Sequence, residues 1–166
     1  MSLYSIYPKQ NRTYKPDPAV DVLTEQTIRL GAEAIDRADA IKQSGELLVN
    51  AGYVASSYVD GMLAREKVLS NYLGNGLAIP HGRTEDLKDV YHTGMSVLQL
   101  PHGVDWEPGQ KAYLVIGLAA VSAEHFAILT NLVEVLRDQR TIQELIHTTD
   151  PMVIVERLTR GSADVT

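Results

Sequence analysis

Residues 72–82, Tyr-Leu-Gly-Asn-Gly-Leu-Ala-Ile-Pro-His-Gly, combine a turn, a short strand and a histidine. The Gly-Asn-Gly triplet predicts a turn, because glycine adopts backbone conformations that other residues avoid. The apolar residues 77–79 then predict a strand. Pro80 fixes the backbone after this strand and removes a hydrogen-bond donor. The stretch therefore predicts a strand with His81 at its end, held between a rigid residue and a permissive one.

The sequence before this stretch predicts one short strand and two helices. Residues 26–30 are expected to form the strand. An aspartate begins a helical pattern over 36–50, and Gly52 is the expected stop signal. Ser56 or Ser57 is expected to cap the second helix, which runs up to the glycine-rich turn.

The sequence after it predicts two strands and three helices. Residues 93–100 and 112–120 are expected to be strands, and the second is apolar throughout, as in a central strand. Ser122 and Asp138 precede helical patterns, and Asp150-Pro151 places proline at the first position of another helix. Interleaved strands and helices indicate an α/β (α+β) fold, a small mixed sheet flanked by helices on both faces.

Length and composition indicate one globular domain over 21–160, after an extended arm at 1–20 and before a polar tail at 161–166. The formal net charge of −6 argues against a nucleic-acid partner. The chain has no cysteine, which excludes disulfides and thiol chemistry. No apolar run approaches the roughly 18 residues of a membrane span, and no signal peptide opens the chain, so a cytoplasmic location is expected.

Two of the five histidines are candidates for chemistry. His81 is well placed to be a nucleophile, although a turn histidine without a role would have the same local pattern. His125 falls in the first turn of the helix after Ser122, where free N–H groups and partial positive charge stabilise phosphate and keep an imidazole neutral. The alternative for His125 is a half-exposed helix histidine.

Arg65, at the end of the second helix, is the candidate partner of His81. Its planar guanidinium is suited to a phosphoryl group, and the alternative is a solvated surface charge. His92, His102 and His147 carry no such signal. The histidines lack HxxxH or HxH spacing and there is no GxSxG motif, so we expect no metal, no cofactor and no serine hydrolase.

Several motifs together resemble a known family. They are 62–67 (Met-Leu-Ala-Arg-Glu-Lys), 72–82, 93–94 (Thr-Gly), 114–120 (Leu-Val-Ile-Gly-Leu-Ala-Ala) and Glu-His at 124–125. From about residue 24 to residue 158 the chain is similar to the mannitol/fructose-type enzyme IIA domain (EIIA type 2) of the sugar phosphotransferase system. Two departures are an alanine where the family often has asparagine before the Glu-His pair, and the tyrosine-bearing basic arm.

The resemblance implies a phosphotransferase component. His81 would accept a phosphoryl group from phosphorylated HPr and pass it to an enzyme IIB domain for sugar uptake, with the membrane enzyme IIC as an indirect partner. The family's arginine and second histidine fall on Arg65 and His125, which we expect to stabilise the transferring group. Leu73, Ile79 and Phe126 are candidates for an apolar rim.

Two other functions stay open at this point. One is a regulatory enzyme IIA of the nitrogen-related branch, which acts by phosphorylation-dependent binding and moves no sugar. The other is a ligand-binding protein that has lost its phosphorelay, against which the intact His81, Arg65 and His125 argue.

Overall fold

A computed structural model describes residues 22–165 of the protein; the expected arm at 1–20 lies outside the described residues. The centre of the fold is a five-stranded sheet in the order β1-β4-β5-β3-β2. The strands are β1 (Ile28–Arg29), β2 (Tyr72–Gly74), β3 (Leu77–Ala78), β4 (Gly94–Glu107) and β5 (Gln110–Ala119).

The sheet is mixed, as the sequence predicts. β1 is parallel to β4 and β3 is parallel to β5, whereas β4 with β5 and β2 with β3 are antiparallel. The strand expected at 26–30 is shorter, because residues 25–27 form a 3₁₀ turn capped by Thr24. β4 is longer than expected, since its pairing with β5 resumes at Val104 after a register shift.

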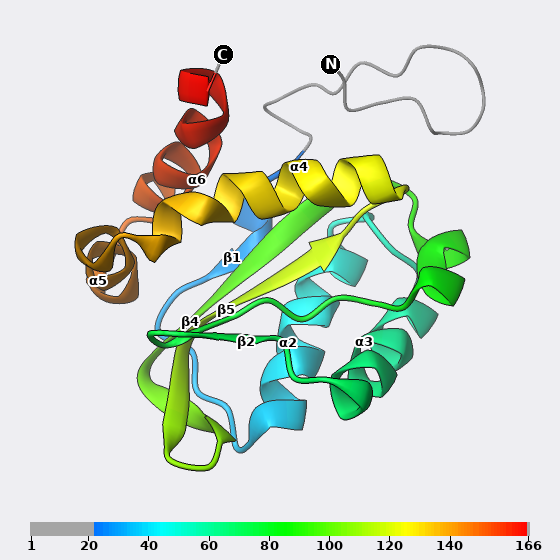
Figure 1. Ribbon diagram of the computed structural model, residues 1–166, viewed down its shortest axis with the longest axis horizontal. Helices are drawn as coiled ribbons and strands as arrows, with labels where there is room; N and C mark the ends of the chain where they lie inside the picture. Colours follow the sequence, from blue (N-terminus) through cyan, green and yellow to red (C-terminus); the bar gives the residue numbers. More distant parts are fainter. Residues whose placement is uncertain (1–21, 166) are drawn as a thin grey trace.

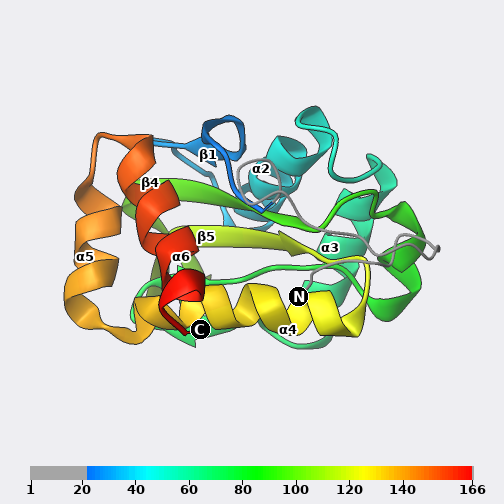
Figure 2. The same ribbon diagram turned by 90° about the horizontal axis from the view of Figure 1, so that it is seen from above.

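Helices cover both faces of the sheet, which confirms the predicted architecture. α2 (Arg37–Asn50) and α3 (Ser57–Val68) lie on one face (Figure 1). α4 (Ala123–Val133), α5 (Gln139–His147) and α6 (Pro151–Val165) lie on the other (Figure 2). α6 continues to Val165, so residues 161–165 of the expected polar tail are helical. Among the described residues, no helix is long and apolar enough to cross a membrane.

The hydrophobic core is divided between the two faces because successive side chains of a strand point in opposite directions. Ile116 and Leu118 of β5 belong to the cluster beneath α4, α5 and α6. Val115 and Ala119 belong to the cluster beneath α2 and α3. β5 is therefore buried on both sides, which explains its continuous apolar sequence.

Side-chain caps begin three of the helices where the sequence predicts. Asp36 accepts a hydrogen bond from the N–H of Asp39 at 2.8 Å. The Ser122 and Asp138 side chains each accept one from the backbone N–H three residues further on, at 3.1 Å. These caps fix where α2, α4 and α5 start. Ser56 precedes α3 without a side-chain cap.

His81 extends the pairing of β3 with β5. Leu77 pairs with Leu114, and His81 pairs with Leu118 in the same register. β5 ends one residue later and leads into α4. The N-terminus of α4 therefore lies beside His81, at the edge of the sheet formed by the carboxyl ends of β3 and β5. Figure 1 shows this end of α4 near the end of the molecule that carries α3 and the 3₁₀ helix at Thr84–Asp89.

Candidate functional site

A cavity of about 520 Å³ opens at this edge of the sheet. Three segments line it: α3, the chain that follows β3, and the start of α4. The lining side chains with chemical or packing relevance are Arg65, Val68, His81, Arg83, Leu87, Ser122 and Phe126. The structure therefore brings His81, Arg65 and the N-terminus of α4 around one cavity.

The imidazole of His81 is held in one tautomer. Its Nδ1 lies 3.0 Å from the carbonyl oxygen of Gly82. A carbonyl can only accept, so Nδ1 carries the proton and donates it, and the lone pair of the neutral ring is on Nε2. Burial lowers the pKa of His81, and the positive charge of Arg65 lowers it further. His81 is therefore neutral near pH 7, with its lone pair on Nε2.

Tyr58 fixes the backbone on the other side of His81. Its hydroxyl donates to the carbonyl of Leu118 at 2.7 Å and accepts the N–H of Gly82 at 2.9 Å. Burial raises the pKa of Tyr58, so the hydroxyl keeps the proton that it donates. A Cβ on Gly82 would lie 2.6 Å from the Tyr58 ring, and glycine is therefore required after the histidine.

The rim of the cavity is apolar but differs in part from the expected set. Phe126 contacts His81 edge-on, with ring centroids 4.8 Å apart, which supports its expected place. Ile79 is a core residue and not part of the rim. Leu73 is exposed but does not line the cavity. Val68 and Leu87, which the sequence analysis did not single out, are both exposed and line it.

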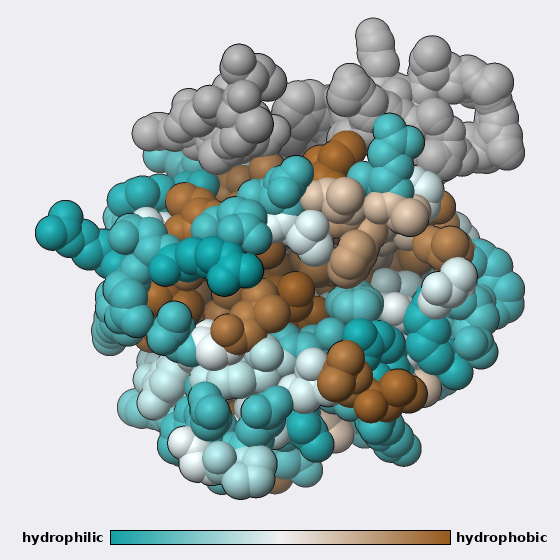
Figure 3. Space-filling view, viewed as in Figure 1, coloured by the Kyte–Doolittle hydropathy of each residue, from teal (hydrophilic) through white to brown (hydrophobic). Residues whose placement is uncertain are grey.

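An apolar surface continues from this rim. Figure 3 shows a hydrophobic patch over the C-terminal end of α3, where Val68 is 79% and Leu69 is 65% exposed. Solvent-exposed apolar side chains beside a functional cavity are typical of a docking surface.

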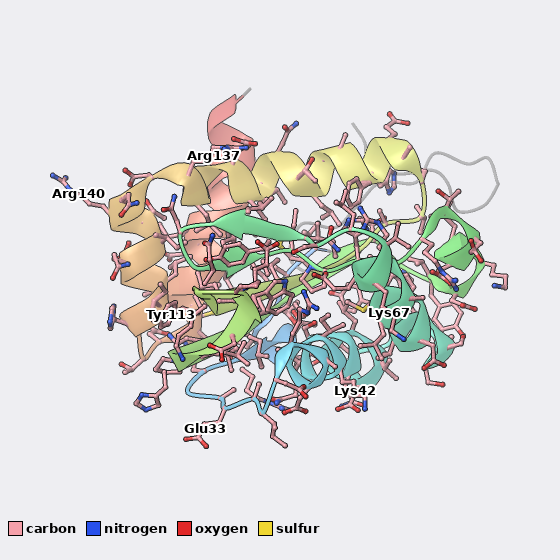
Figure 4. The ribbon with its side chains drawn as sticks, turned by 60° about the horizontal axis from the view of Figure 1, so that its bottom comes forward. Glu33, Lys42, Lys67, Tyr113, Arg137 and Arg140 are labelled. Carbon is pink, nitrogen blue, oxygen red and sulfur yellow. The ribbon has the colours of Figure 1, made fainter. Side chains whose placement is uncertain are left out.

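Arg65 lies in the last turn of α3, and its Nη1 donates to the carbonyl of Leu69 at 2.7 Å. The neighbouring Glu66 anchors this turn: its buried carboxylate accepts from Trp106 Nε1 at 2.9 Å and from the Asn71 N–H at 3.1 Å. Arg65 is thus held at the cavity by a fixed helix end. Figure 4 shows α3 and α2 from below, with Lys67 and Lys42 labelled on their surfaces.

His125 lies in the first turn of α4, as predicted, but it is only 2% exposed and does not line the cavity. The alternative of a half-exposed histidine is therefore wrong. Its Nδ1 is 2.7 Å from Thr93 Oγ1, which also accepts the N–H of Val121 at 3.1 Å. This arrangement favours a Thr93 hydroxyl that donates to Nδ1, with the ring proton on Nε2. Burial lowers the pKa of His125 to about 4, so the ring is neutral.

The cavity is suited to an anion. The first N–H groups of a helix have no intrahelical acceptor and carry partial positive charge, and Ala123 at the start of α4 lines the cavity. Arg65 adds a full positive charge, whereas the guanidinium of Arg83 is paired with Glu85 and Asp86. Within residues 22–165, no group of three His, Cys, Asp or Glu side chains could hold a metal ion. The side-chain and backbone donors of the cavity are suited to a phosphate-like group.

Known proteins resemble this chain in sequence and in fold. Residues 21–161 match the family model for "Phosphoenolpyruvate-dependent sugar phosphotransferase system, EIIA 2". The chain is 45% identical to the mannitol-specific phosphotransferase enzyme IIA component of Halalkalibacterium halodurans over 125 residues, 75% of this chain and 86% of that protein.

Longer proteins also match. A multiphosphoryl transfer protein of Rhodobacter capsulatus is 45% identical over 143 residues, which are 86% of this chain and 17% of that protein. The chain thus spans about a sixth of that relative. Among solved structures, the complex of enzyme IIAMTL and phosphorylated enzyme IIBMTL from Escherichia coli matches with a TM-score of 0.78 and 40% identity, covering 83% of this chain and 97% of that one.

The lowered pKa of His125 predicts a specific acid sensitivity. The folded value, about 4, is below the ordinary value of 6.5, so the unfolded state binds more protons between these values. The stability due to neutral His125 is present above pH 6.5 and is lost as the pH falls towards 4. Urea unfolding at pH 7 and pH 5 should show a larger loss in the wild type than in His125→Gln. The exposed His102→Gln variant is the control and should lose as much stability as the wild type. An equal loss of stability in the wild type and in His125→Gln would contradict the lowered pKa of His125.

Proposed function

This chain belongs to the EIIA 2 family of the phosphoenolpyruvate-dependent sugar phosphotransferase system, and we propose that it carries a phosphoryl group on His81 between two other proteins of that system. The observation that carries this proposal is the state of the His81 ring. Its Nδ1 is occupied by the Gly82 carbonyl, and the ring lines a cavity that is suited to an anion.

The donor is phosphorylated HPr and the acceptor is an enzyme IIB domain. The Escherichia coli relative in complex with phosphorylated enzyme IIB supports this acceptor. The mannitol-specific relative favours sugar uptake over the regulatory alternative, with the membrane enzyme IIC served indirectly through IIB. The protein would act in the cytoplasm, on the side of the membrane where these carriers exchange phosphoryl groups.

The transfer is an in-line displacement between two imidazoles. The Nε2 lone pair of neutral His81 attacks the phosphorus atom of the donor's phosphohistidine. A new N–P bond forms while the donor's N–P bond breaks, and its electron pair returns to the donor's imidazole. The transition state is loose and spreads charge over the equatorial oxygens, so the protein contributes mainly position and electrostatic stabilisation. The same steps in reverse order pass the group to enzyme IIB.

Three groups stabilise the transferring phosphoryl group. The N–H groups at the start of α4 supply donors and partial positive charge. Arg65 supplies a planar pair of donors from the opposite wall. His125 lies buried in the first turn of α4, outside the cavity lining, so its neutral ring would donate Nε2–H to the group only after the ring turns towards the cavity.

The apolar rim controls access of water. Phe126 packs on the imidazole, and Val68 and Leu87 stand exposed at the cavity edge. When a partner covers these side chains, water is expelled and the electrostatic contacts inside become stronger. The rim therefore provides both the docking contact and the dry environment that favours transfer over hydrolysis.

Replacing the nucleophile should abolish transfer without unfolding the protein. His81→Ala is expected to accept no phosphoryl group from phosphorylated HPr, because no other ring nitrogen in the cavity is placed to receive it. His102→Ala, which changes an exposed histidine of β4, is the matched control and should be labelled normally. Labelling is followed with ³²P-phosphoenolpyruvate, HPr, the enzyme that phosphorylates HPr, and the purified variant. Undiminished labelling of His81→Ala would contradict the assignment of His81 as the phosphoryl acceptor.

His125 is expected to affect the rate more than the end point. Loss of one transition-state donor typically costs about 10²–10³ in rate, so His125→Ala should slow transfer in both directions by that order and still permit slow labelling of His81. Rapid-quench kinetics would be run at a temperature where circular dichroism shows the variant folded, since the residue is buried. Rates within a few-fold of the wild type would mean that His125 only packs.

A further inference from the structure

A buried carboxylate lies close to His81 but takes no direct part in the transfer described above. Asp86, in the 3₁₀ helix after His81, is 3% exposed. Its Oδ2 accepts hydrogen bonds from the backbone N–H of Arg83 at 2.7 Å and from Arg83 Nε at 2.9 Å. Its Oδ1 accepts one from Arg83 Nη2 at 3.0 Å. These bonds to Arg83 lower the pKa of Asp86, so the carboxylate is charged.

The fold makes space for this carboxylate against α3. A Cβ on Gly61, in the interior of α3, would lie 2.2 Å from Asp86 Oδ2. A Cβ on Gly82 would lie 3.2 Å from Asp86 Cβ. Glycine within a helix is destabilising relative to alanine. At position 61 it is needed because any larger residue would clash with the Asp86 side chain.

One peptide unit connects Asp86 to the imidazole of His81. The N–H of Arg83 and the C=O of Gly82 belong to the same planar trans peptide and point in opposite directions. The N–H donates to Asp86 at 2.7 Å, and the C=O accepts from His81 Nδ1 at 3.0 Å. The orientation of this peptide, and with it the partner of Nδ1, is therefore set by the carboxylate.

We propose that Asp86 is a positioning residue that acts through the Gly82–Arg83 peptide to keep the ring proton of His81 on Nδ1 and the lone pair on Nε2. The negative charge also polarises the peptide, which makes the Gly82 oxygen a stronger acceptor. In hydrolase triads a carboxylate orients an imidazole by direct contact; here one peptide unit lies between the two groups. The inference rests on the proposed function only for the use of Nε2 in transfer.

A purely structural role for Asp86 makes a different forecast. If the carboxylate only caps the 3₁₀ helix, its loss would lower stability and leave the His81 tautomer unchanged. The tautomer is therefore the measurement that separates the two roles, and it does not require any phosphorylation partner.

The test is long-range ¹H–¹⁵N NMR of the full-length protein with ¹⁵N-labelled histidine at neutral pH. Wild-type His81 should be in the Nδ1–H form. Asp86→Ala should convert His81 to a mixture of tautomers. Phosphoryl acceptance should slow by about tenfold or more, as when a residue that orients a reactive side chain through a hydrogen bond is removed. Asp86→Asn, which has the same shape and a neutral oxygen acceptor, should restore part of both properties. Glu85→Gln is the matched control for the tautomer.

The control is informative because Glu85 contacts the same arginine, with Oε2 at 3.4 Å from Arg83 Nη1, but does not bind the peptide. If Asp86→Ala folds and its His81 keeps the Nδ1–H form, the proposal is overturned. If Asp86→Ala does not fold, the proposal is overturned by an Asp86→Asn variant that keeps the Nδ1–H form and accepts phosphoryl groups at the wild-type rate. A tautomer that responds to Asp86 in a protein whose His81 is never phosphorylated would uphold the positioning role and refute the proposed function.

Discussion

The site depends on the hydrogen bond between the Pro80 carbonyl and the N–H of Leu118, 2.9 Å long. This bond extends the β3–β5 pairing beyond Ala78 and brings His81 into register with Leu118. Since β5 leads directly into α4, the same bond sets the histidine beside the N-terminus of that helix. Parallel strands commonly present ligand sites at their carboxyl ends, and here the strand, the helix and the reactive ring meet at one such end.

The second requirement is a neutral imidazole. A protonated His81 would have no lone pair on Nε2 and could not attack phosphorus. Burial and the charge of Arg65 keep the ring neutral, while the Gly82 carbonyl decides which nitrogen carries the proton. In the proposed transfer Arg65 would bind the phosphoryl oxygens, and its charge also lowers the proton affinity of His81. His125 follows the same principle, since burial leaves it a neutral donor.

Local sequence patterns predicted the helices and the main strands, because caps, glycine stops and apolar periods are local signals. β4 was underestimated because residues 101–103, Pro-His-Gly, have the sequence of a turn yet lie within the strand. Ile79 was placed on the rim because its sequence shows apolarity but not which face it occupies. Tyr58 was missed because its hydrogen bond to Gly82 forms only when α3 packs against the turn after His81. Asp86 was missed because its local bond to the Arg83 N–H depends on the conformation of that turn, which the sequence pattern did not indicate.

The position of the phosphoryl group on the ring tests the account most directly. The phosphorylated protein, labelled with ¹⁵N-histidine, can be studied by ³¹P and ¹H–¹⁵N NMR at neutral to alkaline pH, where a phosphoramidate persists. The structure predicts phosphorus on Nε2 of His81, with Nδ1 still protonated and bound to the Gly82 carbonyl. Phosphorus on Nδ1, or on any other histidine, would contradict the claim that this hydrogen bond selects the acceptor atom.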